Sequence, residues 1–277
     1  MSTSERAAGM VERRLWSIEH LASLGSTLSR AWFRGHACVA QELTPRVFRS
    51  HPVREFALIE AFKREAPALS PVPADDDHIA WLFLMQHHGM PTRLLDWTRS
   101  VLVAAYFAVS DEPDADGELW AMYPPALNKH TIGEGFPSAR SRHLQYLAAE
   151  PSTNPAQFAE MLGIPPPLCP LAFLPPVRFP RMLAQLSVFT IHPAPQPDRT
   201  IPTLLTAAEH LVRYIIPASE KASLRRALAA LGITRRTLFP DLDSLSVSLV
   251  DDEDSGSRYS APSPPVFGED QGRPGKK

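Results

Sequence analysis

Polar side chains that can do chemistry gather in a few short stretches of this sequence. Arg34 follows two aromatic residues and precedes Gly35, and its planar guanidinium is suited to phosphate oxygens. His87 and His88 titrate near neutrality, so either can act as an acid or a base. Purely structural roles for Arg34, His87 and His88 remain open as alternatives to these chemical roles. Arg34 can pair with Asp96 at a core edge, and the histidines can close a helix whose dipole favours them.

A second polar group follows further along the chain. Asp96 offers a carboxylate, Thr98 and Ser100 offer hydroxyl groups, and Gln185 offers a neutral amide. The stretch from Asp96 to Thr98 can instead cap a helix that starts at Val101. Gln185 can instead satisfy backbone groups in a turn. Both interpretations stay open on the sequence alone.

Strands are predicted to hold these groups. Aromatic or β-branched content predicts those at 31–35, 187–192 and 212–216, polar–apolar alternation predicts the one at 117–123, and its short length predicts the one at 93–98. Apolar residues at helical spacing predict helices over 18–28, 52–65, 101–109 and 219–231, and one between the acidic run Asp75–Asp77 and Gly89. A final amphipathic turn or two is expected after Leu242.

This order of elements predicts an α+β protein, a single mixed domain with a small, mostly antiparallel sheet flanked by helices. We expect a flexible N-terminus over residues 1–16, one domain over 17–251, and a disordered tail over 252–277 that is rich in Asp, Ser, Gly and Pro. Within the domain, residues 124–180 are rich in proline and predict an ordered but irregular excursion over the surface. At most one short helix is expected there, near 156–162.

Composition excludes several classes of function. The chain of 277 residues has 28 Lys and Arg against 30 Asp and Glu, a net charge of −2, so no overall positive field exists to attract nucleic acid. Two cysteines, Cys38 and Cys169, are too few for a disulfide scaffold and lack zinc-site spacing, so no metal is expected. No signal peptide and no apolar run of membrane-spanning length is found, so we expect a cytoplasmic protein without a membrane partner.

Four stretches together resemble the FRG domain family. They are Trp32-Phe33-Arg34-Gly35, then residues 86–98 (QHHGMPTRLLDWT), then residues 181–185 (RMLAQ), and lastly Leu231-Gly232-Ile233 with residues 238–242 (LFPDL). They span roughly residues 32–249. This chain has His36 after the Arg-Gly pair, where that family usually carries glutamine.

A more distant resemblance, in order and local pattern, is to toxin-like ADP-ribosyltransferases. These enzymes use an arginine on a first core strand, a Ser-Thr-Ser strand followed by a short helix, and a glutamate at a later strand. Arg34 looks like the first element, the segment 96–107 looks like the second, and Gln185 falls where the glutamate belongs. The resemblance implies an ADP-ribosyltransferase-like fold and NAD as the substrate.

That resemblance gives each residue an expected role. Arg34 would bind the pyrophosphate, Gly35 would approach the nicotinamide through its backbone, and Thr98 and Ser100 would hold the ribose, with His87 or His88 as acid or base. Because Gln185 supplies no charge, Asp96 is the expected carboxylate beside the oxocarbenium-like state. The catalytic candidates are thus Arg34, Asp96, Thr98 and Gln185.

The sequence therefore predicts an NAD-dependent ADP-ribosyltransferase or NAD-hydrolysing enzyme, acting as a toxin or phage-defence effector. The alternative is a non-catalytic nucleotide-binding or interaction module. A metal-dependent nuclease ranks below both, because no HxH pair of metal ligands occurs and the net charge is slightly negative. Neither the macromolecular target nor the oligomeric state follows from the sequence.

Overall fold

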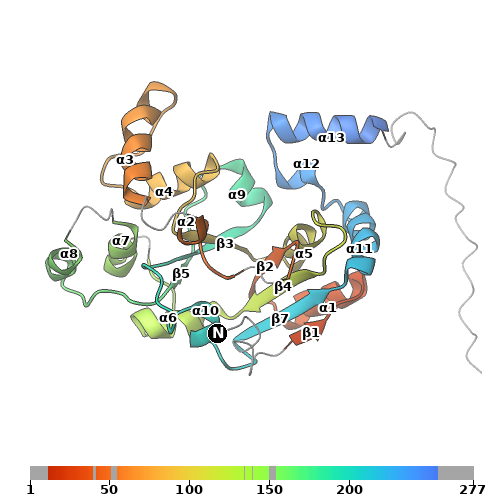
Figure 1. Cartoon of the computed structure of the whole chain (residues 1–277), viewed down its shortest axis with the longest axis horizontal. Coiled ribbons are helices and arrows are strands. Elements are labelled where there is room, and N and C mark those ends of the chain that lie inside the picture. The colour runs from red at the N-terminus through yellow and green to blue at the C-terminus, as the bar shows by residue number, and fades with distance from the viewer. Residues whose placement is uncertain are drawn as a thin grey trace, which may run out of the picture.

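A mixed sheet of seven strands organises the protein, and helices pack against both of its faces (Figure 1). The computed structural model describes residues 12–39, 42–50, 55–133, 135–138, 140–149 and 154–254. The strands lie in the order β1-β7-β4-β2-β3-β6-β5. Only β1 and β7 run parallel among the neighbouring pairs in the described ranges. The strands are β1 (Glu12–Arg14), β2 (Trp32–His36), β3 (Leu94–Thr98), β4 (Gly117–Met122), β5 (Leu171–Phe173), β6 (Ser187–Ile191) and β7 (Leu211–Ile216).

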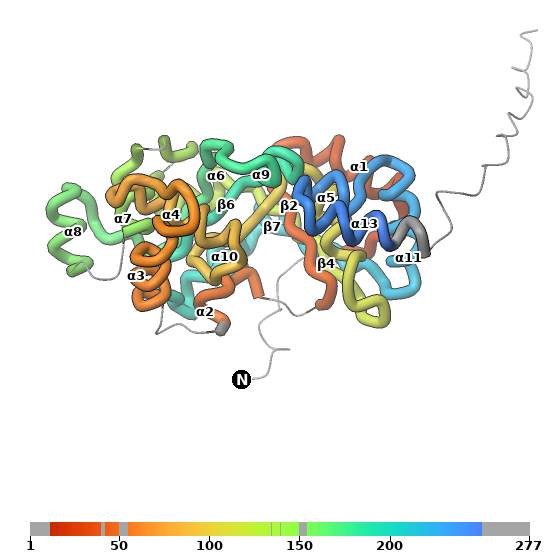
Figure 2. Tube along the Cα trace, turned by 90° about the horizontal axis from the view of Figure 1, so that it is seen from above, coloured from red at the N-terminus to blue at the C-terminus, as the bar shows by residue number. Residues whose placement is uncertain are grey.

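Helices of different lengths surround this sheet. Figure 2 shows α3, α7 and α8 at one end of the molecule and α11 and α13 at the other. In the described part of the chain, no helix is both long and apolar enough to cross a membrane. The helices are α1 (Ile18–Thr27), α2 (Arg46–Ser50), α3 (Glu55–Glu65), η2 (Ala66–Ala68, a 3₁₀-helix), α4 (His78–His87), α5 (Val101–Val109), α6 (Pro124–Ile132), α7 (Arg142–Ala148), α8 (Pro155–Leu162), α9 (Pro180–Ala184), α10 (Ile201–Leu204), α11 (Ala218–Ala230), α12 (Arg235–Leu238) and α13 (Leu242–Asp254).

Capping residues fix the two helices that matter most for the site. The side chain of Asp77 accepts a hydrogen bond from the Ala80 N–H and starts α4, as the acidic run predicts. Gly89 stops α4 with a φ of 80°, a left-handed conformation that glycine adopts without a steric penalty. Ser100 starts α5 by accepting a hydrogen bond from the Val103 N–H.

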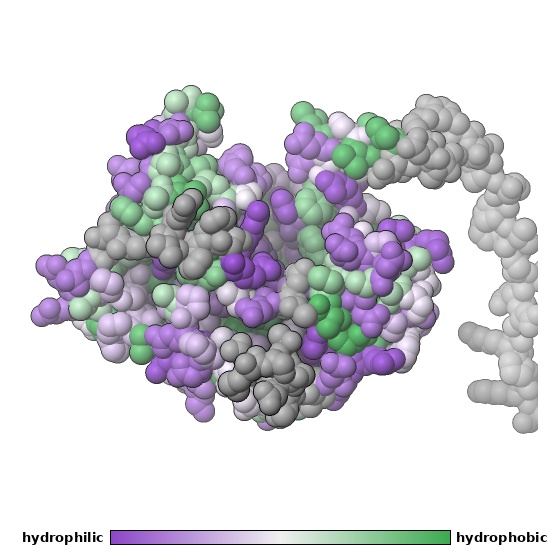
Figure 3. Space-filling view, viewed as in Figure 1, coloured by the Kyte–Doolittle hydropathy of each residue, from purple (hydrophilic) through white to green (hydrophobic). Residues whose placement is uncertain are grey.

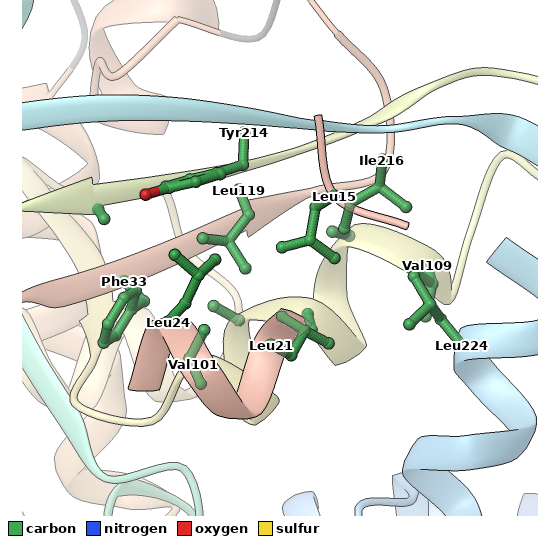
Figure 4. Close-up of a cluster of buried hydrophobic side chains, with 14 of the residues drawn as sticks. Leu15, Leu21, Leu24, Phe33, Val101, Val109, Leu119, Tyr214, Ile216 and Leu224 are labelled. Atoms are coloured by element: carbon green, nitrogen blue, oxygen red, sulfur yellow. The ribbon is translucent and has the colours of Figure 1, made fainter. Parts of the chain in front are cut away.

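The largest apolar cluster lies between the sheet and the helices α1, α5 and α11 (Figure 4). Leu21 of α1, Leu119 of β4 and Ile216 of β7 are each fully buried there. Burying one such aliphatic side chain contributes roughly 1.5–3 kcal/mol relative to leaving it in water. This cluster therefore fixes the position of α5 on the strands β2, β4 and β7.

Two glycines allow α5 to approach the sheet very closely. A Cβ atom added at Gly35 would lie 1.8 Å from the carbonyl oxygen of Ala104, and one at Gly117 would lie 2.4 Å from that of Ala108. Ala104 and Ala108 are one helical turn apart, so the same face of α5 rests on both glycines. The absence of a side chain at Gly35 is thus required by the packing of this helix.

The five predicted strands are confirmed as β2, β3, β4, β6 and β7, and the mixed α/β character is confirmed with them. The sheet is larger than predicted because two short strands were missed. β1 consists of exposed charged residues that carry no apolar pattern. β5 has three residues within a proline-rich stretch, although all three are buried.

The predicted segment boundaries change accordingly. Residues 12–14, predicted as part of a flexible N-terminus, form the edge strand β1. The short helix predicted near 156–162 is confirmed as α8, but the predicted irregular excursion over 124–180 also contains α6, α7 and β5. Pro124 starts α6 from its first turn instead of excluding a helix. Helix α13 extends to Asp254, beyond the predicted turn or two. The rest of the predicted tail, and the predicted helix start at Pro52, lie outside the described residues.

We expect Gly35→Ala to destabilise the protein by more than about 3 kcal/mol, because the new methyl group meets the backbone of α5, which cannot turn aside as a side chain would. Chemical denaturation measures the free energy of unfolding. Gly25→Ala is the matched control, since its Cβ would lie 3.1 Å from the Val101 side chain and it would raise helix propensity. Similar small effects from both substitutions would contradict this account of Gly35.

Candidate functional site

A cavity of about 320 Å³ opens where the ladder between β2 and β3 ends. These strands pair only through Phe33 and Thr98, within the described ranges. Figure 3 shows the hollow between the part of the surface that carries α3 and α4 and the part that carries α5, α12 and α13. The cavity is lined by residues from β2, β3, α4, α5, α9 and β6: Phe33, Arg34, Gly35, Phe83, Gln86, His87, Asp96, Trp97, Thr98, Val103, Ala104, Phe107, Phe179, Arg181, Met182, Gln185, Ser187 and Phe189.

Arg34 spans the opening between the two strands. Its Nη1 donates to the carbonyl oxygen of Asp96 at 2.6 Å, and its Nε donates to Nε2 of His36 at 2.8 Å. Burial lowers the pKa of the Arg34 guanidinium, while the charge of Asp96 opposes that shift. An arginine keeps its charge in proteins, so the cavity holds a cation that is partly withdrawn from water.

His36 and Glu118 form a buried pair behind Arg34. Nδ1 of His36 lies 2.7 Å from Oε1 of Glu118. Oε2 of Glu118 accepts a hydrogen bond from Nε of Arg213 at 2.8 Å, and Nη2 of Arg213 completes the ion pair, also at 2.8 Å. Burial lowers the pKa of His36, although Glu118 favours its charged form. Burial alone would raise the pKa of Glu118, but the hydrogen bond from His36 and the charge of Arg213 lower it. Glu118 is therefore an anion held between the side chains of His36 and Arg213.

Asp96 is exposed at the cavity and lies within electrostatic reach of two arginines. Its charge raises the pKa of both Arg34 and Arg181, against the burial that lowers them. In the described residues, no hydrogen bond occupies its carboxylate, and it is the only carboxylate that lines the cavity. Asp96 is therefore available to a ligand.

Arg181 is a site residue that the sequence interpretation missed. It lies on α9, with its guanidinium carbon 4.4 Å from the centroid of the Phe239 ring. Phe239 also packs edge-on against Phe107 of α5, at 6.0 Å between ring centroids. The sequence did contain a signal for this residue, because Arg181 is the first residue of the RMLAQ stretch, but the prediction used only Gln185 of that stretch.

Thr98, Ser100 and Gln185 are held by the protein itself. The Thr98 hydroxyl donates to the Gln185 carbonyl at 2.7 Å and accepts from the Ser100 N–H at 3.0 Å. Nε2 of Gln185 donates to the Leu238 carbonyl at 3.1 Å. Thr98 and Gln185 line the cavity, but Ser100 does not. Ser100 caps α5, the role that the structural alternative gave to Asp96 or Thr98.

The two predicted histidines have different positions. His87 lines the cavity and stacks on Phe179, with ring centroids 4.1 Å apart and planes 5° from parallel. Burial lowers the pKa of His87, and the nearby His88 and Arg181 lower it further. His88 lies outside the cavity lining and is the C-cap of α4. His87 is therefore a neutral group at neutral pH, in the same cavity as Arg181.

These features define a mixed α/β protein with a cationic cavity at a split in its sheet. Residues 29–117 match the FRG domain, which confirms the predicted resemblance to the FRG domain family over this part of the chain. The matched range includes Arg34, His87 and Asp96, whereas Arg181 and Gln185 lie beyond it. Neither the curated proteins nor the solved structures contain a match to this chain. In the described residues, no group of three His, Cys, Asp or Glu side chains is placed to hold a metal ion.

We expect Thr98→Val to lower the free energy of unfolding by about 1–3 kcal/mol, because it leaves the Gln185 carbonyl and the Ser100 N–H without their partner. Thr98→Ser keeps the hydroxyl and should retain most of that stability. Thermal and chemical denaturation of both variants measure the difference. An unchanged stability in Thr98→Val would show that the hydroxyl is free for a ligand.

Proposed function

We propose that the cavity binds NAD and that the chain cleaves the bond between nicotinamide and ribose, transferring ADP-ribose to an acceptor or to water. The observation that carries this proposal is the meeting of Arg34, Arg181 and Asp96 in one cavity. Two cations suit a pyrophosphate, and one carboxylate suits a sugar that becomes positively charged. A volume of about 320 Å³ falls at the lower end of small-ligand cavities, which hold about 300–1,000 Å³.

The arginines supply the anion site. In the described residues, Nη2 of Arg34 has no hydrogen-bond partner, so it remains for a phosphate oxygen while Nε and Nη1 hold the side chain in place. Arg181 enters from α9, with its guanidinium held against Phe239. Both guanidiniums are already partly buried, so binding a ligand costs them less hydration than it would cost exposed arginines. A diphosphate between them gains charge-assisted hydrogen bonds.

Asp96 supplies the charge that cleavage needs. When the C1′–N bond breaks, its electron pair leaves with nicotinamide and positive charge develops on the ribose. A carboxylate beside C1′ stabilises that charge more in the transition state than in the ground state. Water or an acceptor group then bonds to C1′ and releases a proton, and neutral His87 is the cavity base that can take it.

The topology supports the likeness to toxin-like ADP-ribosyltransferases. Arg34 lies on β2, Asp96 and Thr98 lie on β3 before α5, and Gln185 lies two residues before the start of β6. β2, β3 and β6 are neighbours in the sheet, so the three motif positions come together at one place. The proposed ADP-ribosyltransferase-like fold rests on this order.

A second candidate function is NAD binding without turnover. The polar groups of Thr98 and Gln185 are both occupied by the protein, so neither contributes a free group to the ribose. A module of this kind would recognise the nucleotide through Arg34 and Arg181 alone. It predicts ligand-dependent stabilisation without release of nicotinamide.

We expect Asp96→Asn to lower the rate of nicotinamide release by about 10²–10³-fold with little change in KM, because the isosteric amide keeps the shape and removes the charge. Arg34→Ala should weaken NAD binding by about 1.5–3 kcal/mol, through loss of a charged hydrogen bond. Chromatography measures nicotinamide release by the full-length chain, and calorimetry measures NAD binding.

Arg178→Ala is the control for loss of a positive charge, since Arg178 pairs with Asp77 at the surface and does not line the cavity. It should release nicotinamide at the wild-type rate. Turnover by Asp96→Asn at the wild-type rate would rule out the proposed role of Asp96. Wild-type protein that binds NAD but releases no nicotinamide would favour the second candidate, and absence of NAD binding would rule out both.

A further inference from the structure

A line of polar side chains runs along one face of the sheet, from Arg34 on β2 across β4 to Arg213 on β7. His36 lies directly opposite Glu118 in the pairing of β2 with β4, and Arg213 lies opposite Trp120 in the pairing of β4 with β7. Side chains opposite each other, or two residues apart on one strand, share a face of the sheet. The register therefore places Arg34, His36, Glu118 and Arg213 on one face, where hydrogen bonds join them in that order.

The hydrogen bonds in this line permit only one protonation state of His36. Nε of arginine carries a hydrogen and has no lone pair to accept with, so Nε2 of His36 must be the acceptor in the 2.8 Å bond from Arg34. A neutral imidazole then carries its hydrogen on Nδ1, which donates to Oε1 of Glu118 at 2.7 Å. Glu118 accepts from Arg213 through its other oxygen. His36 must be neutral, with its proton on Nδ1, for the line to hold.

We propose that His36 is a positioning residue that fixes Arg34 in the cavity, and that protonation of His36 at Nε2 releases Arg34 and weakens anion binding. A proton on Nε2 would place two N–H donors and two positive charges face to face. The bond from Arg34 Nε would be lost, and the guanidinium would keep only its bond to the Asp96 carbonyl. Anion binding in the cavity is therefore sensitive to acid through His36, which does not itself line the cavity.

The charges around His36 set the direction of this response. Arg34 on β2 and Arg49 on α2 disfavour the protonated form, and Glu118 on β4 favours it. Burial is the largest influence and lowers the pKa of His36 below its ordinary value of about 6.5. His36 is thus neutral at neutral pH. As the pH falls below about 6.5, the unfolded chain binds a proton that the native state resists, so stability also falls.

His36→Gln separates positioning from titration. Its amide oxygen can accept from Arg34 and its amide N–H can donate to Glu118, as the two ring nitrogens do, but the amide does not titrate. His36→Ala leaves both partners without their bonds. His87→Gln is the matched control, because His87 titrates inside the cavity itself. Burial lowers the pKa of His192 to about 3, so His192 stays neutral as the pH falls from 8 through the weakly acidic range.

The experiment measures binding of NAD and of inorganic pyrophosphate to the full chain by calorimetry, from pH 8 down to the pH at which each variant unfolds. Wild-type affinity should stay constant near neutrality and fall at least tenfold in acid. His36→Gln should bind as wild type does at pH 8 and lose the acid-dependent fall. His36→Ala should bind at least tenfold more weakly at every pH, and His87→Gln should keep the fall. A fall that persists in His36→Gln, or is missing from the wild type, would overturn the proposal.

This inference rests on the proposed function only for the choice of NAD as a probe, and a ligand-free measurement separates the two. Nitrogen-15 NMR of the free protein should show His36 protonated at Nδ1 alone at pH 7, and the Arg34 Nε–H signal should shift as His36 titrates. Detection of the Nε2–H tautomer would overturn the positioning role whatever the ligand is. If that signal behaves as expected while NAD and pyrophosphate both fail to bind, the proposed function fails and the positioning role stands.

Discussion

The close approach of α5 to the sheet is the constraint on which the rest of the structure depends. Gly35 and Gly117 let the backbone of the helix lie directly on β2 and β4. Because Ser100 caps α5 only two residues after β3 ends, the position of the helix also decides where β3 meets β2. The strands touch at one pair, Phe33 and Thr98, and then separate. The cavity is a consequence of that separation, and the side chain of Arg34 bridges it where a ladder hydrogen bond would otherwise run.

The same arrangement decides how much of the charge on Arg34 remains for a ligand. Glu118 is fully buried on the neighbouring strand, and a direct pair with it would neutralise the arginine. Neutral His36 stands between them, and Glu118 pairs with Arg213 instead. Asp96, the carboxylate on the other side, is exposed, so water screens its attraction for Arg34. Two hydrogen bonds thus fix Arg34, and neither acceptor carries a negative charge. The charge of Arg34 therefore remains largely uncompensated, as an anion site requires.

Sequence patterns predicted the elements whose residues are distinctive, and missed those defined by tertiary contacts. The five longer strands, with their aromatic, β-branched or alternating residues, and the Asp77 cap of α4 followed from local chemistry. β1 and β5 have three residues each and exist only because a long strand offers an edge, which no local pattern encodes. The site shows the same division. Arg34, His87 and Asp96 lie in quoted motifs and share the cavity, whereas His36 gains its role only through the register that places it opposite Glu118.

The cavity also shows why the range that matches the FRG domain is not the whole functional unit. Residues 29–117 supply Arg34 and Asp96, but Arg181 comes from α9, and Phe239 beyond α12 holds it in place. Gln185 joins the same region to the core through the Leu238 carbonyl. Moreover, the two strands inside the matched range are β2 and β3. β2 pairs along its whole length with β4, which begins only at residue 117, and β3 pairs along its whole length with β6, so both need partners from later in the chain. Phe239 of the LFPDL stretch therefore orients Arg181, the second arginine of the site. The sheet and the anion site become complete only with the segments that follow residue 117.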